Sequence, residues 1–165
     1  MRLVAKTRAL SLLSCLGAAL VVLVLAACGS SEATTPTACF EGAATYEKAL
    51  TEAPGEVRVN GETLISECFA ERQEGGDLAQ VGEALVEVAT RLDAEAREDP
   101  GGKANLELGY LLGAATAGAE GTQGIHENLL RRLEVVTRYT PGEQALSPRF
   151  TKTYREGFDA GKETG

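Results

Sequence analysis

Two successive helical patterns, separated by a break at Pro100-Gly101-Gly102, constrain the fold most strongly. Between Asp77 and Arg97, apolar residues recur every three or four positions, at Leu78, Val81, Leu85, Val88, Ala89, Leu92 and Ala96. This spacing predicts one apolar helix face, and Asp77 and Gln80 have the spacing of a capping box at its start. The second pattern, from about Ala104 to Ala119, is apolar nearly all round. A helix without a polar face must be buried, so we expect it at the centre of an all-α domain.

Small residues form a ridge on this second helix. Gly109, Gly113 and Ala117 lie four positions apart. Such a ridge lets a neighbouring backbone approach closely, and a cavity lined by small residues is the functional alternative.

Three further helices are expected. The first begins at Ala38 and ends before Ala53-Pro54-Gly55. Another carries Ile125, Leu129, Leu133, Val136 and Tyr139 and ends at Thr140-Pro141-Gly142. The last starts at Ser147-Pro148, a cap followed by proline at the first helical position, places Phe150, Tyr154 and Phe158 on one face, and ends at Gly161.

Residues 57–73 allow two interpretations. Val57-Arg58-Val59 before Asn60-Gly61 is typical of a β-hairpin with a type I′ turn. Leu64, Ile65, Cys68 and Phe69 instead form a helical stripe that Asn60 could cap. We favour a helix over about 62–73 and keep the hairpin open. The prediction is an all-α, compact, irregular bundle of five or six short helices with one disulfide.

The N-terminus has the pattern of a secretory signal. Arg2, Lys6 and Arg8 precede an uncharged run from Ala9 to Leu25. A basic end, an apolar run and small residues at a cleavage site describe a signal peptide. An uncleaved anchor helix is the alternative, although 17 residues lie near the lower limit of about 17–25 for a spanning helix.

Leu25-Ala26-Ala27-Cys28 resembles the lipobox of bacterial lipoproteins. The resemblance implies cleavage before Cys28 and a lipid on its thiol. We therefore expect a signal peptide over 1–27, a lipidated flexible tether over 28–37, and a single helical domain over 38–165. The protein is then held to a cell membrane by its acyl chains, on the extracytoplasmic side.

The charge of the chain after the cleavage site excludes one class of partner. Thirteen basic and 24 acidic residues remain, a net charge of −11. A protein this acidic is repelled by nucleic-acid phosphates. Residues 29–127 carry 6 basic and 19 acidic residues, whereas 128–165 carry 7 and 5.

Cysteine parity predicts a disulfide. Cys15 leaves with the signal and Cys28 carries lipid, so Cys39 and Cys68 remain. Two cysteines in an exported domain are expected to pair, which contributes about 3–4 kcal/mol by the chain-entropy model. No ligand pattern for a metal or cofactor is present in the sequence, and we expect neither.

Candidate functional residues are few. The single histidine, His126, is a candidate general base with Glu127 or Glu107, or else a partly buried histidine hydrogen-bonded near a helix start. A basic surface is a second candidate, formed by Arg131, Arg132, Arg138, Arg149, Lys152, Arg155 and Lys162. The alternative is that these residues pair with acids such as Glu127 and Glu134.

We expect no catalytic set and name His126, Tyr110, Arg131 and Arg132 as candidate contacts for a ligand or partner. The leading hypothesis is a non-enzymatic lipoprotein of the cell envelope that binds a protein or a small ligand. The alternatives are a hydrolase-like enzyme using His126 with a nearby carboxylate, and a structural spacer without a deep pocket.

Overall fold

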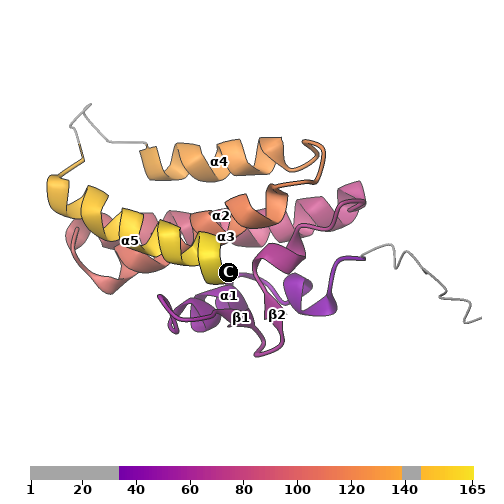
Figure 1. Cartoon of the computed structure of the whole chain (residues 1–165), viewed down its shortest axis with the longest axis horizontal. Helices are drawn as coiled ribbons and strands as arrows, with labels where there is room; N and C mark the ends of the chain where they lie inside the picture. The colour runs from indigo at the N-terminus through magenta and orange to yellow at the C-terminus, as the bar shows by residue number, and fades with distance from the viewer. Residues whose placement is uncertain (1–33, 139–145) are drawn as a thin grey trace, which may run out of the picture.

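The computed structural model describes residues 34–138 and 146–165 (Figure 1). The expected signal peptide, Cys28, Tyr139 and the expected stop at Thr140-Pro141-Gly142 lie outside these residues. In chain order the elements are the 3₁₀ turn η1 (Thr37–Phe40), α1 (Ala43–Leu50), β1 (Arg58–Val59), β2 (Thr63–Leu64), the 3₁₀ turn η2 (Ser66–Cys68), α2 (Gly75–Glu98), α3 (Lys103–Ala119), α4 (Glu127–Arg138) and α5 (Pro148–Thr164). The all-α bundle is confirmed. Within the described ranges, no helix is both long and apolar enough to cross a bilayer.

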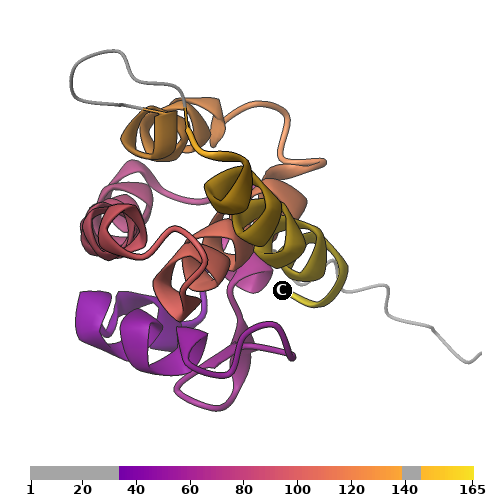
Figure 2. The ribbon, with the colours of Figure 1, turned by 90° about the vertical axis from the view of Figure 1, so that its left-hand side faces the viewer.

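Helix α3 is the centre of the bundle, as its composition predicted. Leu108, Tyr110, Leu111, Ala114 and Ala115 are fully buried. The helix contacts α1, α2, α4, α5 and η2, and Figure 2 shows the other helices arranged around it. The apolar face predicted for α2 is confirmed as well. Of its seven predicted residues, the six from Val81 to Ala96 are buried, and Leu78 packs at the edge of the core.

The glycine ridge of α3 packs directly on the backbone of α5. A Cβ atom added to Gly109 would lie 2.1 Å from the carbonyl oxygen of Tyr154, and one added to Gly113 would lie 2.1 Å from that of Phe158. The contact is reciprocal, since a Cβ at Gly161 would lie 2.1 Å from the carbonyl oxygen of Tyr110. The ridge is therefore filled by a neighbouring helix and lines no cavity there.

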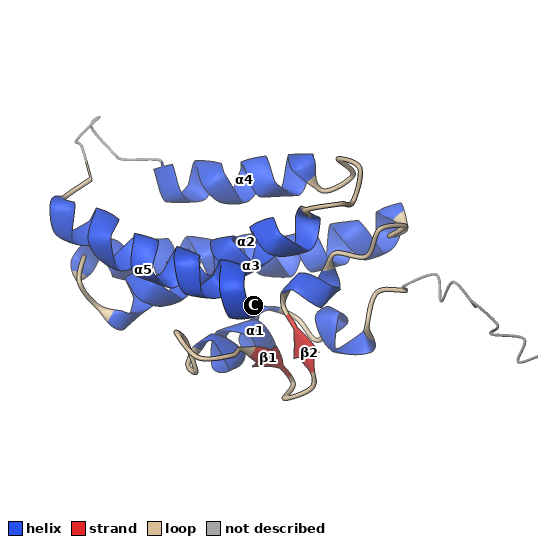
Figure 3. Ribbon diagram, viewed as in Figure 1, coloured by secondary structure: helices blue, strands red, loops and turns tan. Residues whose placement is uncertain are grey.

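The prediction of a helix over 62–73 was wrong, and the hairpin forms instead (Figure 3). Arg58 pairs with Leu64 and Val59 with Thr63. Asn60 and Gly61 have φ values of 53° and 77°, the left-handed conformations that a type I′ turn requires and a helix start excludes. Asn60 caps no helix, and its side chain donates to Glu41 instead.

Three helices also have boundaries that differ from the prediction. The first helix is divided, because Gly42 has a φ of 81° between η1 and α1. The prediction that Asp77 begins the next helix with a capping box was wrong. Helix α2 begins at Gly75, and Asp77 is already inside it, since the N–H of Leu78 donates to the carbonyl of Glu74. Gly161 does not end α5, which continues to Thr164 because this glycine serves packing rather than termination.

Two local predictions are confirmed. Ser147 caps α5 by accepting a hydrogen bond from the N–H of Phe150 at 3.1 Å, with Pro148 at the first position. Cys39 and Cys68 form a buried disulfide across 29 residues, which ties η1 to η2. The hydroxyl of Tyr46 donates to the carbonyl of Cys39 at 2.9 Å, and burial raises the pKa of this phenol.

Candidate functional site: an apolar groove between α4 and α5

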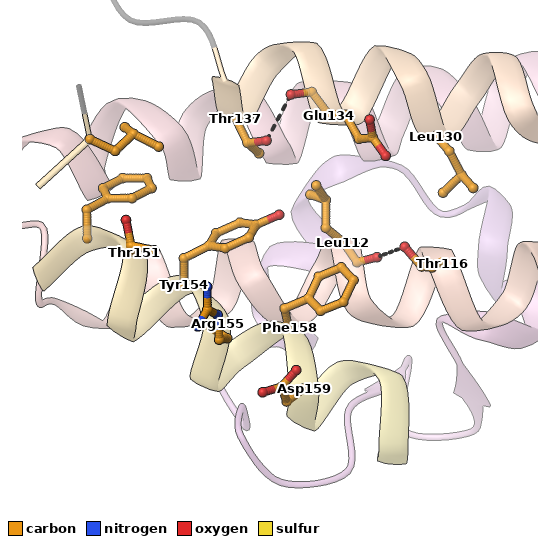
Figure 4. Close-up of a pocket in the computed structure, with 12 residues that line it drawn as sticks. Leu112, Thr116, Leu130, Glu134, Thr137, Thr151, Tyr154, Arg155, Phe158 and Asp159 are labelled. Carbon is orange, nitrogen blue, oxygen red and sulfur yellow. Dashed lines mark hydrogen bonds between the residues drawn. The ribbon is translucent and has the colours of Figure 1, made fainter. Parts of the chain in front are cut away.

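A groove of about 570 Å³ runs between α4 and α5, with α3 as its floor (Figure 4). Its lining is mostly apolar. The lining residues are Leu112 and Thr116 of α3, Leu130, Glu134 and Thr137 of α4, Leu146 before α5, and Phe150, Thr151, Tyr154, Arg155, Phe158 and Asp159 of α5.

One wall is a row of aromatic rings on α5. Phe150, Tyr154 and Phe158 lie four positions apart, so they follow one another along a single helix face. Successive ring centroids are 6.3 Å apart, with interplanar angles of 12° and 26°. Phe150 is buried, whereas Tyr154 and Phe158 are half-buried. The predicted aromatic face is thus confirmed, but it forms a groove wall as well as core.

The opposite wall exists because α4 uses a different face for its own packing. Leu129 and Leu133 are buried, and Leu129 lies against Gly82 of α2. Leu130 is only half-buried and turns toward the groove, as Figure 4 shows. The groove is therefore the space left where α4 packs on α2 and α3 while α5 packs on α3.

The threonines of the groove offer it few hydrogen-bond donors. The hydroxyls of Thr116, Thr137 and Thr151 donate to the carbonyls of Leu112, Glu134 and Ser147, at 2.7, 2.9 and 3.2 Å. Charged groups are confined to Glu134 of α4 and to Arg155 and Asp159 of α5, all exposed. Such a lining suits an apolar ligand better than a strongly polar one.

His126 lies away from this groove, in the core. It is fully buried, its Nε2 lies 2.8 Å from Oε1 of Gln73, and Phe69 packs edge-on at 5.1 Å between ring centroids. The amide nitrogen of Gln73 donates to Thr35 and to the carbonyl of Cys68, so its oxygen is left to accept from His126. Burial lowers the pKa of His126.

Neither proposed carboxylate partner is bonded to His126. The only hydrogen bond found for the imidazole among the described residues is the one to Gln73, and its Nδ1 is buried without a partner there. Glu107 instead pairs with Lys103 at 3.5 Å at the start of α3, where burial raises the pKa of Glu107. The structure does not bring His126 and an acid together in a cleft.

Tyr110 is also internal. It is fully buried, and its hydroxyl accepts the N–H of Val57 at 3.0 Å and shares a hydrogen bond with Thr164 at 3.0 Å. The side chain thus joins α3 to the hairpin segment and to the end of α5, and no ligand reaches it without moving the core.

The basic residues of the C-terminal third divide into two groups. Arg149, Lys152 and Lys162 form ion pairs with Asp99, Glu156 and Glu120, at 3.9, 3.7 and 2.6 Å. Arg131 and Arg132 on α4 and Arg155 on α5 are exposed and have no ion pair in the parts of the chain that the structure describes. The side chain of Arg138 lies outside the described residues.

Metal-binding geometry is absent from the described ranges, where no group of three or more His, Cys, Asp or Glu side chains gathers.

The sequence did not predict the groove. The one sequence feature that could have indicated the groove is the aromatic row of α5. Three large rings on an amphipathic helix present more apolar surface than a contact with one neighbouring helix can cover.

No family model, curated protein or solved structure matches this chain.

Proposed function

We propose that the protein is a lipid-anchored, extracytoplasmic binding module whose α4–α5 groove holds an elongated, largely apolar small ligand. The observation that carries this proposal is the groove itself. Its volume of about 570 Å³ falls within the range of about 300–1,000 Å³ typical of small-molecule sites. Its aromatic row extends along the axis of α5, which favours a long ligand over a compact one.

The extracytoplasmic location is supported by the N-terminal sequence and by the disulfide. The basic end, the uncharged run and the lipobox-like Leu25-Ala26-Ala27-Cys28 occur in the order of a lipoprotein signal. Buried disulfides such as Cys39–Cys68 belong to oxidising compartments. The intact mass of the protein extracted from its own membrane is expected to include a lipid on Cys28, which Cys28→Ser removes.

The two alternative functions have less support. A hydrolase would need His126 in a cleft beside a carboxylate, and His126 is instead buried against Gln73 and Phe69. A spacer would need a surface without a deep pocket, which the α4–α5 groove does not fit.

Ligand binding is tested with a neutral naphthylamine dye that fluoresces in apolar surroundings. The chain beginning at Gly29 is suitable because the described core lies entirely within residues 34–165. We expect saturable fluorescence that long-chain lipids extracted from the native membrane displace. Leu130→Glu places a charge in the groove and is expected to weaken dye binding at least about tenfold, since an unpaired charge there is desolvated by an apolar ligand.

The matched control is Val135→Glu, which introduces the same charge on the same helix at a position 60% exposed and outside the groove. This variant should bind the dye like the parent protein. Far-UV circular dichroism and a thermal melt of both variants show that each is folded. Equal dye binding by parent, Leu130→Glu and Val135→Glu would contradict the proposal.

A further inference from the structure

The outer face of α4 combines basic and apolar side chains, and its arginines have no ion pair to a carboxylate among the described residues. Asn128, Arg131, Arg132 and Val135 recur at intervals of three and four, so they share one side of the helix. All four are exposed, and Val135 at 60% is the most exposed large hydrophobic residue that the structure describes. The two acids of α4 border this face: Glu134 lines the groove, and Glu127 lies beside Gly124.

These two arginines differ from three of the other cations nearby and share the lack of an ion pair with Arg155 of α5, which lies at the groove. Arg149, Lys152 and Lys162 each lie within 4 Å of a carboxylate, whereas Arg131 and Arg132 do not, within the described ranges. An unpaired pair of guanidinium groups keeps its full capacity to bind anionic oxygens. The outer face of α4 therefore presents two such arginines on one side of a helix, which lets this acidic molecule approach another anion there.

The fold converts the charge asymmetry of the sequence into an asymmetry in space. In Figure 2, α4 lies at one end of the bundle and α1 with the hairpin lies at the other. The α1 end carries exposed or half-exposed acids at Glu41, Glu47, Glu52, Glu56, Glu62 and Glu67. An anionic surface therefore repels the α1 end and attracts the α4 end.

We infer that the outer face of α4 docks on the anionic headgroups of the membrane that carries the anchor, with Val135 inserted at the interface. The inference rests on the proposed anchor but not on ligand binding in the groove. Six residues lie between Cys28 and Thr35, which is buried in the domain, so the seven residue-to-residue steps span at most about 25 Å. Such a short connection keeps the domain at the bilayer surface, where headgroup charge acts within a Debye length of about 8–10 Å.

This orientation has a consequence for the groove. Helix α4 forms one wall of it, so docking through the outer face of α4 holds that wall against the bilayer. A ligand with a long apolar chain then passes between membrane and groove over a short distance.

The orientation can be measured with single tryptophan reporters, because the chain contains no tryptophan. Val135→Trp reports from the outer face of α4, and Ala44→Trp reports from an exposed position on α1. The chain beginning at Cys28 is coupled through that thiol to a maleimide phospholipid, while Cys39 and Cys68 stay protected in their disulfide. Quenching is read on phosphatidylcholine vesicles with and without phosphatidylglycerol, with a nitroxide on part of the headgroups.

With phosphatidylglycerol at low salt, we expect several-fold stronger quenching in Val135→Trp than in Ala44→Trp. Adding Arg131→Gln and Arg132→Gln should remove the difference, because two arginines shift the orientation by about thirtyfold near an anionic surface. The charge-matched pair Lys48→Gln and Arg91→Gln, on α1 and α2, should preserve it.

Three results would overturn the inference. Equal quenching of the two reporters would show no preferred orientation. A difference that persists on neutral vesicles, or after both arginine substitutions, would show that headgroup charge does not cause it. A Val135→Trp signal that responds to soluble polyphosphate but not to anionic vesicles would assign the face to a polyanionic polymer instead of the membrane.

Because the anchor is supplied chemically, failure of this experiment does not depend on natural lipidation of Cys28. The dye-binding experiment uses the chain without any anchor, so the two proposals fail separately.

Discussion

Among single residues, His126 joins three parts of the chain through its hydrogen bond to Gln73. Its partner Gln73 also donates to Thr35 and to the carbonyl of Cys68, so the network links the start of α4 to the N-terminal segment and to the disulfide region. Because the oxygen of Gln73 accepts from His126, the imidazole donates from Nε2, and burial of a partnerless Nδ1 disfavours a second proton on the ring. The native structure therefore favours the neutral form of this residue.

Protonation of His126 should destabilise the protein. Its pKa is lowered by burial in the native state and is about 6.5 in the unfolded chain. The unfolded state therefore takes up the proton first as the pH falls. The free energy of unfolding should be constant above about pH 7 and should decline below pH 6.5, by up to about 1.4 kcal/mol per pH unit.

Urea unfolding at a series of pH values between about 8 and 5.5 measures this slope. His126→Gln, which removes the only histidine of the chain, should have lower stability but a flatter pH dependence over that interval. An equally steep decline in His126→Gln would assign the effect to other groups.

Tyr110 shows how a side chain that resembles a ligand contact in sequence becomes a structural one. Tyr110→Phe removes the acceptor of the Val57 N–H and leaves that donor buried, at a cost of about 1–3 kcal/mol. Thr164→Val removes the other partner of the hydroxyl but leaves the Val57 bond intact, so it should cost less. Chemical denaturation of both variants tests this order, and a Tyr110→Phe variant as stable as the parent would refute it.

Among elements, the contact between α3 and α5 depends on glycine from both helices. Gly109 and Gly113 face the carbonyl oxygens of Tyr154 and Phe158, while Gly157 and Gly161 face those of Leu106 and Tyr110. Two backbones this close leave no volume for a methyl group, and rigid carbonyls cannot rotate away as side chains do. This packing also fixes which face of α5 remains for the aromatic row.

Gly113→Ala should therefore destabilise the protein by more than about 3 kcal/mol, although alanine is the better helix former. Gly76→Ala is the matched control, because a Cβ at this position of α2 meets nothing within 4 Å. It should stabilise the protein by about 0.5–1 kcal/mol through the loss of glycine flexibility. Thermal or urea unfolding of both variants measures the contrast, and similar effects of the two substitutions would contradict the close-packing argument.

The hairpin at residues 58–64 shows where local signals conflict. A helical stripe and an Asn-Gly turn occupy the same segment, and the turn prevails because Asn60 and Gly61 adopt left-handed conformations that a helix cannot begin with. Glu67 then accepts the N–H of Leu64, and the 3₁₀ turn that follows brings Cys68 to Cys39. The apolar residues still reach the core, but from a ribbon and a 3₁₀ turn.

At the scale of the whole molecule, the groove is a boundary between two packing arrangements. Helix α4 packs on α2 and α3, whereas α5 packs on α3, and the space between them is lined from both sides. If an apolar ligand occupies this space, it should stabilise the folded state by mass action and order α4 and α5 in particular.

Hydrogen exchange should detect this. A saturating apolar ligand is expected to slow exchange in the amides of α4 and α5 and to leave α1 and the hairpin unchanged. The Leu130→Glu variant, treated identically, should show no slowing. Uniform slowing across the chain, or slowing confined to α1, would place the binding site outside the groove.

The sequence by itself determined the helices with strong periodicity, the burial of α3, the Ser147 cap and the Cys39–Cys68 pairing. Each follows from local backbone preference, apolar spacing or a choice among few cysteines. Tertiary structure alone decided that a hairpin forms at Asn60-Gly61 where a helix was expected. It also decided that Tyr110 and His126 are internal and that the aromatic row of α5 is left partly uncovered. An apolar stripe looks the same in sequence whether another helix covers it or not, because its burial depends on where that helix packs in space.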